Sequence, residues 1–147
     1  VILRCLEESV KVDGELWSAM GTCLLVLVGI EQGDTQADVD WLVGKTAGLR
    51  IFDDEAGVMN LSVADIGGEV LAVSQFTLTA STRKGNRPSY IRAAGHELAV
   101  PLYESYCEKL SEALGRSVGK GRFGADMKVS LVNDGPVTII IDSRLRE

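Results

Sequence analysis

Two short stretches of the sequence carry groups that could act on a carbonyl compound. In the first, Ser74, Gln75 and Thr77 stand where a strongly apolar run gives way to a polar loop. Hydroxyl and amide side chains donate and accept hydrogen bonds, and two backbone N–H groups at a strand end could hold a carbonyl oxygen as it becomes an oxyanion. The same residue types also suit the outer face of an ordinary edge strand. Residue types alone leave both interpretations open.

The second stretch is Gly135-Pro136, inside the segment 129–141, where Asn, Asp, Gly and Pro separate two β-branched apolar runs. The runs predict buried strands, and the residues between them predict a tight connection. Gly135 lets other atoms approach its backbone closely, whereas Pro136 fixes φ and offers no N–H. An X–Pro bond can also be cis. We therefore expect a rigid corner, rich in acceptors, that the rest of the chain positions beside the first stretch.

Hydrophobic patterning predicts the elements that position these stretches. Helices are expected from Asp34 or Thr35 to Leu49 and from Leu98 to Leu114, the second with Pro101 in its first turn. Hairpin turns such as Asp13-Gly14 are frequent, and no βαβα alternation is evident. We therefore predict an α+β fold, with a largely antiparallel, barrel-like sheet and two main packed helices. Strands are expected at 1–12, 15–20, 23–30, 50–52, 59–63, 69–76, 118–122 and 127–132, before the strand that follows Pro136.

Length and composition restrict the class of protein. A chain of 147 residues with 24% charged residues predicts one globular domain spanning residues 1–147. No apolar run reaches the roughly 20 residues that cross a bilayer, and no signal-peptide pattern is present, so a cytoplasmic location is expected. The net charge of −6 disfavours extensive binding to a nucleic-acid backbone. A short contact with one end of an RNA remains compatible with it.

Four motifs, in order and at similar spacing, resemble those of the D-aminoacyl-tRNA deacylases, also called D-tyrosyl-tRNA deacylases. The resemblance covers nearly the whole chain. The motifs are Ser74-Gln75-Phe76-Thr77-Leu78, the basic segment 82–89, Gly121-Arg122-Phe123-Gly124-Ala125-Asp126-Met127, and Asn133-Asp134-Gly135-Pro136-Val137-Thr138.

This resemblance implies a hydrolase that cleaves the ester of a tRNA charged with a D-amino acid, a proofreading step in D-amino acid metabolism. It implies a homodimer in which the cis Gly135-Pro136 corner reaches into the partner's active site and leaves no room for an L side chain. Gln75 and Phe76 would supply backbone donors to the substrate carbonyl, while Ser74 would fix their loop. Glycine has no side chain to clash, so the activity could extend to glycyl-mischarged tRNA. No cofactor or metal is implied.

The remaining roles also follow from the resemblance. Arg4 would brace the Gly-Pro corner. Three further sets of residues are implied: Asn133, Val137 and Thr138 supporting the corner, Phe123, Ala125 and Met127 lining the pocket for the terminal adenosine, and Arg83, Lys84 and Arg87 contacting tRNA phosphates.

The sequence leaves alternatives for the identity of the nucleophile and for the class of substrate. Thr77 has no evident base beside it, and His96, the only histidine, is expected to cap a helix or lie on the surface. An unassisted Thr hydroxyl is a poor nucleophile, so water or the substrate's 2′-hydroxyl is favoured over Thr77. The alternative functions are a related deacylase acting on L-alanyl-mischarged tRNA and a non-enzymatic module on the same scaffold.

Three cysteines and three departures from the family pattern complete the sequence observations; the third departure is a tail after Ser143 that runs a little longer than usual. Cys5, Cys23 and Cys107 lack zinc-ligand spacing, so we expect reduced thiols packed as small hydrophobic residues. Leu3 stands where the family usually has Gln, and Lys120 stands where it commonly has Thr. These two positions bear on the bracing of the corner and on the adenosine pocket.

Overall fold

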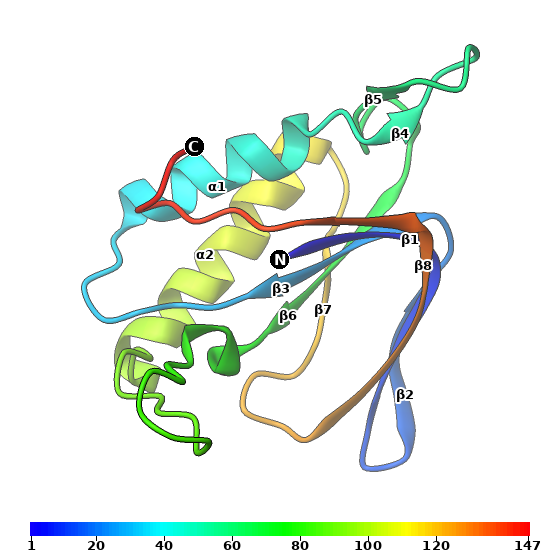
Figure 1. Cartoon of the computed structure of the whole chain (residues 1–147). Coiled ribbons are helices and arrows are strands. Elements are labelled where there is room, and N and C mark those ends of the chain that lie inside the picture. Colours follow the sequence, from blue (N-terminus) through cyan, green and yellow to red (C-terminus); the bar gives the residue numbers. More distant parts are fainter.

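A computed structural model describes residues 1–147 as one sheet curved into a nearly closed barrel, with two helices packed outside it (Figure 1). The strands of the main sheet are β1 (Ile2–Val12), β2 (Glu15–Met20), β3 (Cys23–Val28), β6 (Glu69–Ser74), β7 (Gly119–Lys120) and β8 (Met127–Ile139). The other elements are the small hairpin of β4 (Phe52–Asp53) and β5 (Met59–Leu61), the 3₁₀ helix η1 (Phe76–Thr79), and the helices α1 (Gln36–Gly48) and α2 (His96–Leu114). Neither α-helix has the length and apolarity needed to cross a bilayer.

The main sheet is mixed, which corrects part of the sequence prediction. β1 pairs antiparallel with β2, β3 and β8, but β3 pairs parallel with β6, and β6 pairs parallel with β7. Parallel neighbours need a long crossover, and α1 and α2 lie within these two connections. A βαβ alternation is therefore present after all. The β4–β5 hairpin after α1 and the long loop before α2 obscure it in the sequence.

Side chains that alternate along β3 and β6 build two separate cores. Leu24 and Val70 face the helices, where Tyr106 and Leu110 of α2 cover them. Side chains that point to the other face of these strands, such as Leu25, fill the barrel interior and pack there against Val10 of β1. A strand buried on both faces is expected to read as a continuous apolar run, as 23–30 does. The barrel interior and the outer helical layer thus meet across the same two strands.

The segment 133–137 is a bulge in one long strand, not a turn between two strands. Ile2 pairs with Ile139 and Leu3 with Thr138, after which the register moves to Cys5 opposite Asn133. Asp134 to Val137 therefore stand opposite Arg4 alone, so the chain leaves the ladder and returns to the same partner strand. The prediction of a tight connection between strands is wrong in this respect, because bulges and turns favour the same residue types. The Gly135–Pro136 peptide bond is cis, as expected.

Both helices begin and end at residues that the sequence indicates, with one shift. Thr35 is the N-cap of α1, and its backbone N–H donates to the Asp38 carboxylate at 2.8 Å. Gly115 ends α2 with a left-handed φ of 67°. α2 begins at His96 and not at Leu98, so Pro101 lies beyond the first turn. Its missing N–H leaves the carbonyl of Glu97, an exposed residue, without the usual helical donor.

Candidate active site

A largely apolar pocket of about 570 Å³ opens beside the carboxyl end of β6. Ser74, Gln75 and Phe76 form one wall, and the segment 123–127 before and at the start of β8 forms another. The structure therefore brings together two of the motifs that the sequence analysis singled out, although they lie far apart in the chain. Eleven of the sixteen lining residues are hydrophobic, which suits a flat aromatic ligand with a few polar groups.

The turn after β6 leaves two backbone donors free. The carbonyl of Gln75 accepts from the N–H of Leu78 at 3.2 Å, which closes the first turn of η1. The N–H groups of Phe76 and Thr77 precede that bond and have no acceptor within the protein. The N–H of Gln75 donates to the carbonyl of Val28 at 2.8 Å. In this conformation the free pair is thus Phe76 with Thr77, and the expectation of a free Gln75 donor is corrected.

The side chains of this turn are arranged to hold it in place. The Gln75 side-chain amide donates to the Thr77 hydroxyl. Thr77 does not line the pocket, so its hydroxyl is already engaged on another side of the turn. Phe76 is 59% exposed, and its ring contacts the edge of Tyr90 with centroids 5.1 Å apart. The turn therefore has free backbone N–H groups at Phe76, which lines the pocket, and at Thr77, whereas the Thr77 hydroxyl is already engaged.

Aromatic rings from α2 support the opposite wall. Phe123 lies edge-on to His96 at 5.3 Å and tilted against Tyr103 at 5.8 Å. The Tyr103 hydroxyl donates to the carbonyl of Ala72 at 2.8 Å, and burial raises the pKa of this phenol. Tyr103 is therefore a neutral donor that fixes Phe123 against the sheet. Sequence reasoning assigned His96 only to a cap or the surface, and its place in the pocket wall had no local signal.

Ala125 and Met127 complete this wall, in agreement with their shared motif, and both are partly buried. Lys120, the second departure from the family pattern, does not line the pocket. Its ammonium group pairs with Glu104 at 2.8 Å instead. The substitution therefore changes an ion pair on the surface and leaves the residues of the pocket wall as the motif has them.

The bulge of β8 is braced by side chains on both sides. Arg4 is only 8% exposed, and its Nε donates to the backbone carbonyl of Asp134 at 3.2 Å. The same guanidinium donates from Nη1 to the carbonyl of Ile51 at 2.8 Å and lies 3.5 Å from the Asp53 carboxylate. Arg4 thus connects the bulge to the strand region after α1. Leu3, the first departure, packs its side chain toward the barrel interior.

Asn133 closes the base of the bulge. Its side-chain oxygen accepts from the N–H of Val137 at 3.2 Å, and its Nδ2 donates to the Thr138 hydroxyl at 3.0 Å. Gly135 has φ +121°, and a Cβ added there would meet the Val137 side chain at 2.9 Å and Nη2 of Arg4 at 3.1 Å. A side chain at position 135 would therefore be both strained and crowded.

The bulge and the pocket lie apart within one chain. Neither Gly135 nor Pro136 lines the pocket, and both are exposed. Figure 1 shows the segment that follows β6, in green, at the opposite end of the molecule from the β8 label. A single copy of the chain thus holds both parts of the predicted site without joining them.

The basic segment 82–89 forms an exposed loop that follows η1. Ser81 and Ser89 pair across its base, with backbone hydrogen bonds of 2.8 and 2.9 Å. Arg83, Lys84 and Arg87 are exposed between them, and none forms an intramolecular ion pair. Arg92, which follows the loop, donates to the carbonyl of Thr79 at 3.1 Å and connects it to η1. The three cations therefore stand free on this loop.

Comparisons with known proteins agree on one family. The model of the family described as D-Tyr-tRNA(Tyr) deacylase matches residues 1–142. A D-aminoacyl-tRNA deacylase from Bacteroides thetaiotaomicron is 58% identical over 147 residues, which cover 100% of this chain and 98% of that protein. One from Porphyromonas gingivalis is 60% identical with the same coverage.

Solved structures show the same fold. The c-Myc DNA Unwinding Element Binding Protein superposes with a TM-score of 0.89 and 42% identity, covering 94% of this chain and 93% of that one. A probable eukaryotic D-amino acid tRNA deacylase superposes with a TM-score of 0.77 over 90% of this chain and 92% of that one. Its sequence identity is 14%, so this second likeness supports the fold alone.

Proposed function

The chain belongs to the D-Tyr-tRNA(Tyr) deacylase family, and on that premise we propose that its active site is completed by a second copy of the same chain. The protein is a hydrolase that cleaves the ester bond of D-aminoacyl-tRNA, the reaction that its relatives are named for. The observation that carries the site assignment is the pair of free N–H groups at Phe76, which lines an apolar pocket, and at the adjoining Thr77.

The reaction requires a nucleophile, an oxyanion site and a leaving group. Water, or the 2′-hydroxyl of the terminal ribose, attacks the ester carbonyl carbon. The carbonyl oxygen then gains negative charge, which the N–H groups of Phe76 and Thr77 stabilise. The tetrahedral intermediate collapses, the carbon–oxygen bond to the ribose breaks, and the ribose oxygen takes up a proton. When the 2′-hydroxyl attacks first, water then cleaves the new ester, so the products are the same amino acid and tRNA.

The Thr77 hydroxyl has no part in bond making in this proposal. It is held by the Gln75 side chain and does not line the pocket. Ser74, the last residue of β6, fixes the position at which the turn begins. Orientation and the oxyanion site then account for the catalysis.

Selection between D and L substrates is assigned to the β8 bulge of the partner copy. Gly135 and Pro136 are exposed, yet Arg4 and Asn133 hold the backbone around them. A wall of braced backbone cannot relax by rotating a side chain, so an L side chain that clashes with it is rejected strongly. Attraction to a methyl-sized group, by contrast, contributes only about 1–3 kcal/mol. Glycyl-tRNA, which has nothing to clash, is accepted as well.

An exposed apolar surface beside the bulge supports the pairing of two copies. Leu6 of β1 is 52% exposed, and Leu131 and Val132 of β8 are 37% and 44% exposed. Contiguous apolar side chains on a surface are typical of an interaction site. Two copies related by a two-fold axis would each offer a bulge and each receive one.

The pocket wall of Phe123, Ala125 and Met127 binds the terminal adenosine through stacking and apolar contact, and Arg83, Lys84 and Arg87 bind phosphates nearby. Replacing the three cations with Ala should lower the slope of log affinity against log salt by roughly 0.7 for each phosphate that is no longer neutralised. An unchanged slope would place the tRNA elsewhere. Binding to a DNA unwinding element, which the name of one structural neighbour states of that protein, has no support from a net charge of −6.

The decisive experiment compares one tRNA charged with D-tyrosine and with L-tyrosine. We expect rapid release of D-tyrosine and no release of L-tyrosine above the spontaneous rate. Equal release of both would contradict chiral selection, and no release of either would favour a non-enzymatic module. Rapid release from L-alanyl-tRNA alone would favour the related editing function. Sedimentation of the same sample tests for the dimer, and an active monomer would refute the shared site.

A further inference from the structure

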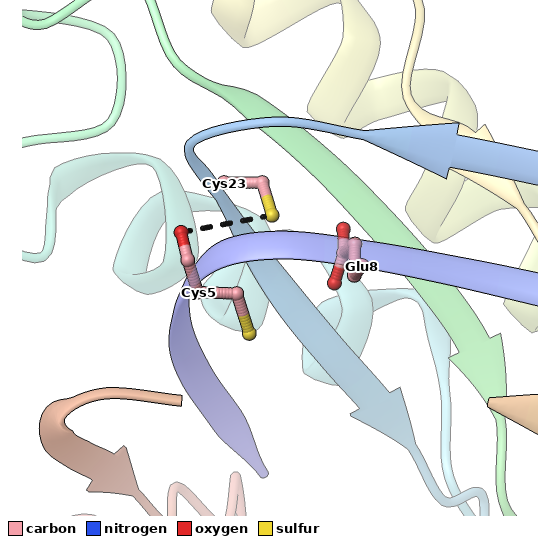
Figure 2. A group of neighbouring side chains, drawn as sticks. All are labelled: Cys5, Glu8 and Cys23. Atoms are coloured by element: carbon pink, nitrogen blue, oxygen red, sulfur yellow. Dashed lines mark hydrogen bonds between the residues drawn. The ribbon is translucent and has the colours of Figure 1, made fainter. Parts of the chain in front are cut away.

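Three side chains that the proposed reaction does not use gather inside the barrel (Figure 2). Cys5 and Glu8 come from β1, and Cys23 comes from β3. Both cysteines are 0% exposed and Glu8 is 3% exposed. The two sulfur atoms and a carboxylate oxygen all lie within 4.8 Å of one another. None of the three residues lines the active-site pocket.

The fold places them together through strand register and a bulge. Cys5 and Cys23 are direct partners in the antiparallel β1–β3 ladder. Cys5 and Glu8 are three residues apart, so a regular strand would direct them to opposite faces. The irregularity between Cys5 and Glu7 changes the phase of β1, and both residues face inward. Regular strand spacing therefore does not predict this group.

Glu8 is in an unusual position for a carboxylate. Neither of its oxygens has a hydrogen-bond partner, and apolar side chains such as Val10 and Leu71 fill the surrounding interior. Burial raises the pKa of Glu8 to about 7, the neighbouring Cys23 thiol lowers it in part, and the charge of Glu69 raises it. An isolated buried carboxylate is costly unless it is paired, protonated or bound to a metal. The two thiols beside it are the groups with which it could share a cation.

We propose that Cys5, Glu8 and Cys23 bind a thiophilic divalent cation of the Zn²⁺ class inside the barrel. Thiolate ligands select zinc over magnesium or calcium, and two thiolates with one carboxylate is a ligand set that zinc accepts. Zinc–sulfur bonds of about 2.3 Å and zinc–oxygen bonds of about 2.1 Å would place the ligand atoms roughly 3.5–3.8 Å apart. The present separations are at most 4.8 Å, so binding requires the three side chains to draw together by up to about 1 Å.

The protons are accounted for in this site, and one net negative charge remains on the bound group. Binding displaces the two thiol protons, along with the carboxyl proton where Glu8 carries one. Two thiolates and a carboxylate carry three negative charges against the two positive charges of the ion. A water molecule or a backbone carbonyl fills the fourth position of a tetrahedral ion. Because the group is enclosed, the metal enters as the barrel closes, and its effect is on folding and stability.

The first test measures metal in the purified protein and in protein refolded with Co²⁺. We expect a single zinc ion per chain that survives gel filtration, and a thiolate-to-cobalt charge-transfer band in the refolded sample. The Cys5→Ala/Cys23→Ala variant should lose both signals. Cys107→Ala is the matched control, because it removes the third buried thiol from the helix-facing core and should keep both. Absence of metal in the unmodified protein, or binding that survives the double substitution, would overturn the proposal.

The second test remains informative if the cysteine variants fold poorly. Thermal unfolding of metal-free protein is measured with and without added Zn²⁺, refolding each sample in the stated condition. The unmodified chain and Cys107→Ala should gain several degrees in Tm when zinc is added, whereas Glu8→Gln should gain little. Without metal, Glu8→Gln should have a higher Tm than the unmodified chain. Equal gains in Glu8→Gln and the unmodified chain would refute a role for this carboxylate. A Cys5–Cys23 disulfide in freshly purified protein would refute the site itself.

Discussion

The turn at Ser74–Thr79 and the bulge at Asn133–Thr138 use their backbone hydrogen-bonding groups in opposite ways. In the turn, the N–H groups of Phe76 and Thr77 are left without acceptors and remain available to a ligand. In the bulge, side chains occupy the backbone groups: Asn133 binds the N–H of Val137, and Arg4 binds the carbonyl of Asp134. In the proposed function, the turn binds charge that develops on a substrate, whereas the braced bulge keeps its shape. A site that joins them separates catalysis from selection.

Removing one free donor should have the largest effect. Phe76→Pro deletes this N–H at the first position of η1, where Pro is tolerated. Gln75 has φ −144° and ψ 82°, outside the α region that a following Pro disfavours. We expect kcat to fall by about 10²–10³, the usual loss for one oxyanion donor.

Phe76→Ala is the control for this change, because it removes the ring and its contact with Tyr90 but keeps the N–H. Single-turnover deacylation of D-tyrosyl-tRNA measures both variants. Equal losses in the two would assign the effect to the ring and not to the backbone donor.

Enlarging the bulge should come next. Gly135→Ala adds a Cβ at φ +121° against Val137 and Arg4, which costs about 1–3 kcal/mol of stability. Displacing the wall by about 1 Å should lower deacylation by about 10²-fold. The loss of activity should therefore be larger than the loss of stability measured by Tm can explain. Normal turnover would exclude the bulge from the site.

Mixing the two inactive variants tests whether the regions act across copies. In a two-fold dimer, half of the randomly paired molecules combine one Phe76→Pro chain with one Gly135→Ala chain, and each of these holds one intact site. Activity should recover to about a quarter of the unmodified level. No recovery after subunit exchange would mean that the turn and the bulge of the same chain cooperate.

Adding a side chain at Gly29, which packs against the turn, should lower kcat less than the changes above. A Cβ on Gly29 would meet Leu78 Cβ at 3.1 Å and the Gln75 carbonyl at 3.2 Å, so Gly29→Ala must move the turn by a few tenths of an ångström. We expect up to about a tenfold loss of kcat with unchanged preference for D over L substrates. A changed preference would show that the turn also takes part in selection.

Removing the Thr77 hydroxyl should have the smallest effect. Thr77→Ala keeps the backbone N–H and removes only the hydrogen bond with the Gln75 side chain. We expect activity within about tenfold of the unmodified enzyme, since a group that supports another's position contributes less than one that binds developing charge. Complete loss of activity in a folded variant would restore Thr77 as the nucleophile.

Local signals predicted most elements, because their residues specify structure without help from distant contacts. Asp13-Gly14 forms the expected hairpin with positive φ at both positions, and Thr35 and Gly115 cap their helices as expected. The structure also brings Ser74–Phe76 and Phe123–Met127, which come from two of the motifs, to one pocket.

The failures share one physical origin, which is pairing between distant strands. The Asn-Asp-Gly-Pro residues suit a turn as well as a bulge, and only the β1–β8 register decides between them. The engaged N–H of Gln75 depends on Val28 in a neighbouring parallel strand. The grouping of Cys5 with Glu8 depends on an irregularity in β1 that no local pattern announces. The roles of the site residues stay predictions until the variants are measured.

The pairing of β1 with β8 has a consequence for how the protein is made. Residues 2–12 are translated well before their partner, residues 127–139. Contacts this distant in sequence close slowly, so the nascent chain carries an unpaired β1 edge until residues 127–139 have been made. The bulge exists only once that final pairing has formed. Selective capacity therefore appears at the end of folding, and a chain stopped before residue 127 would expose an aggregation-prone strand.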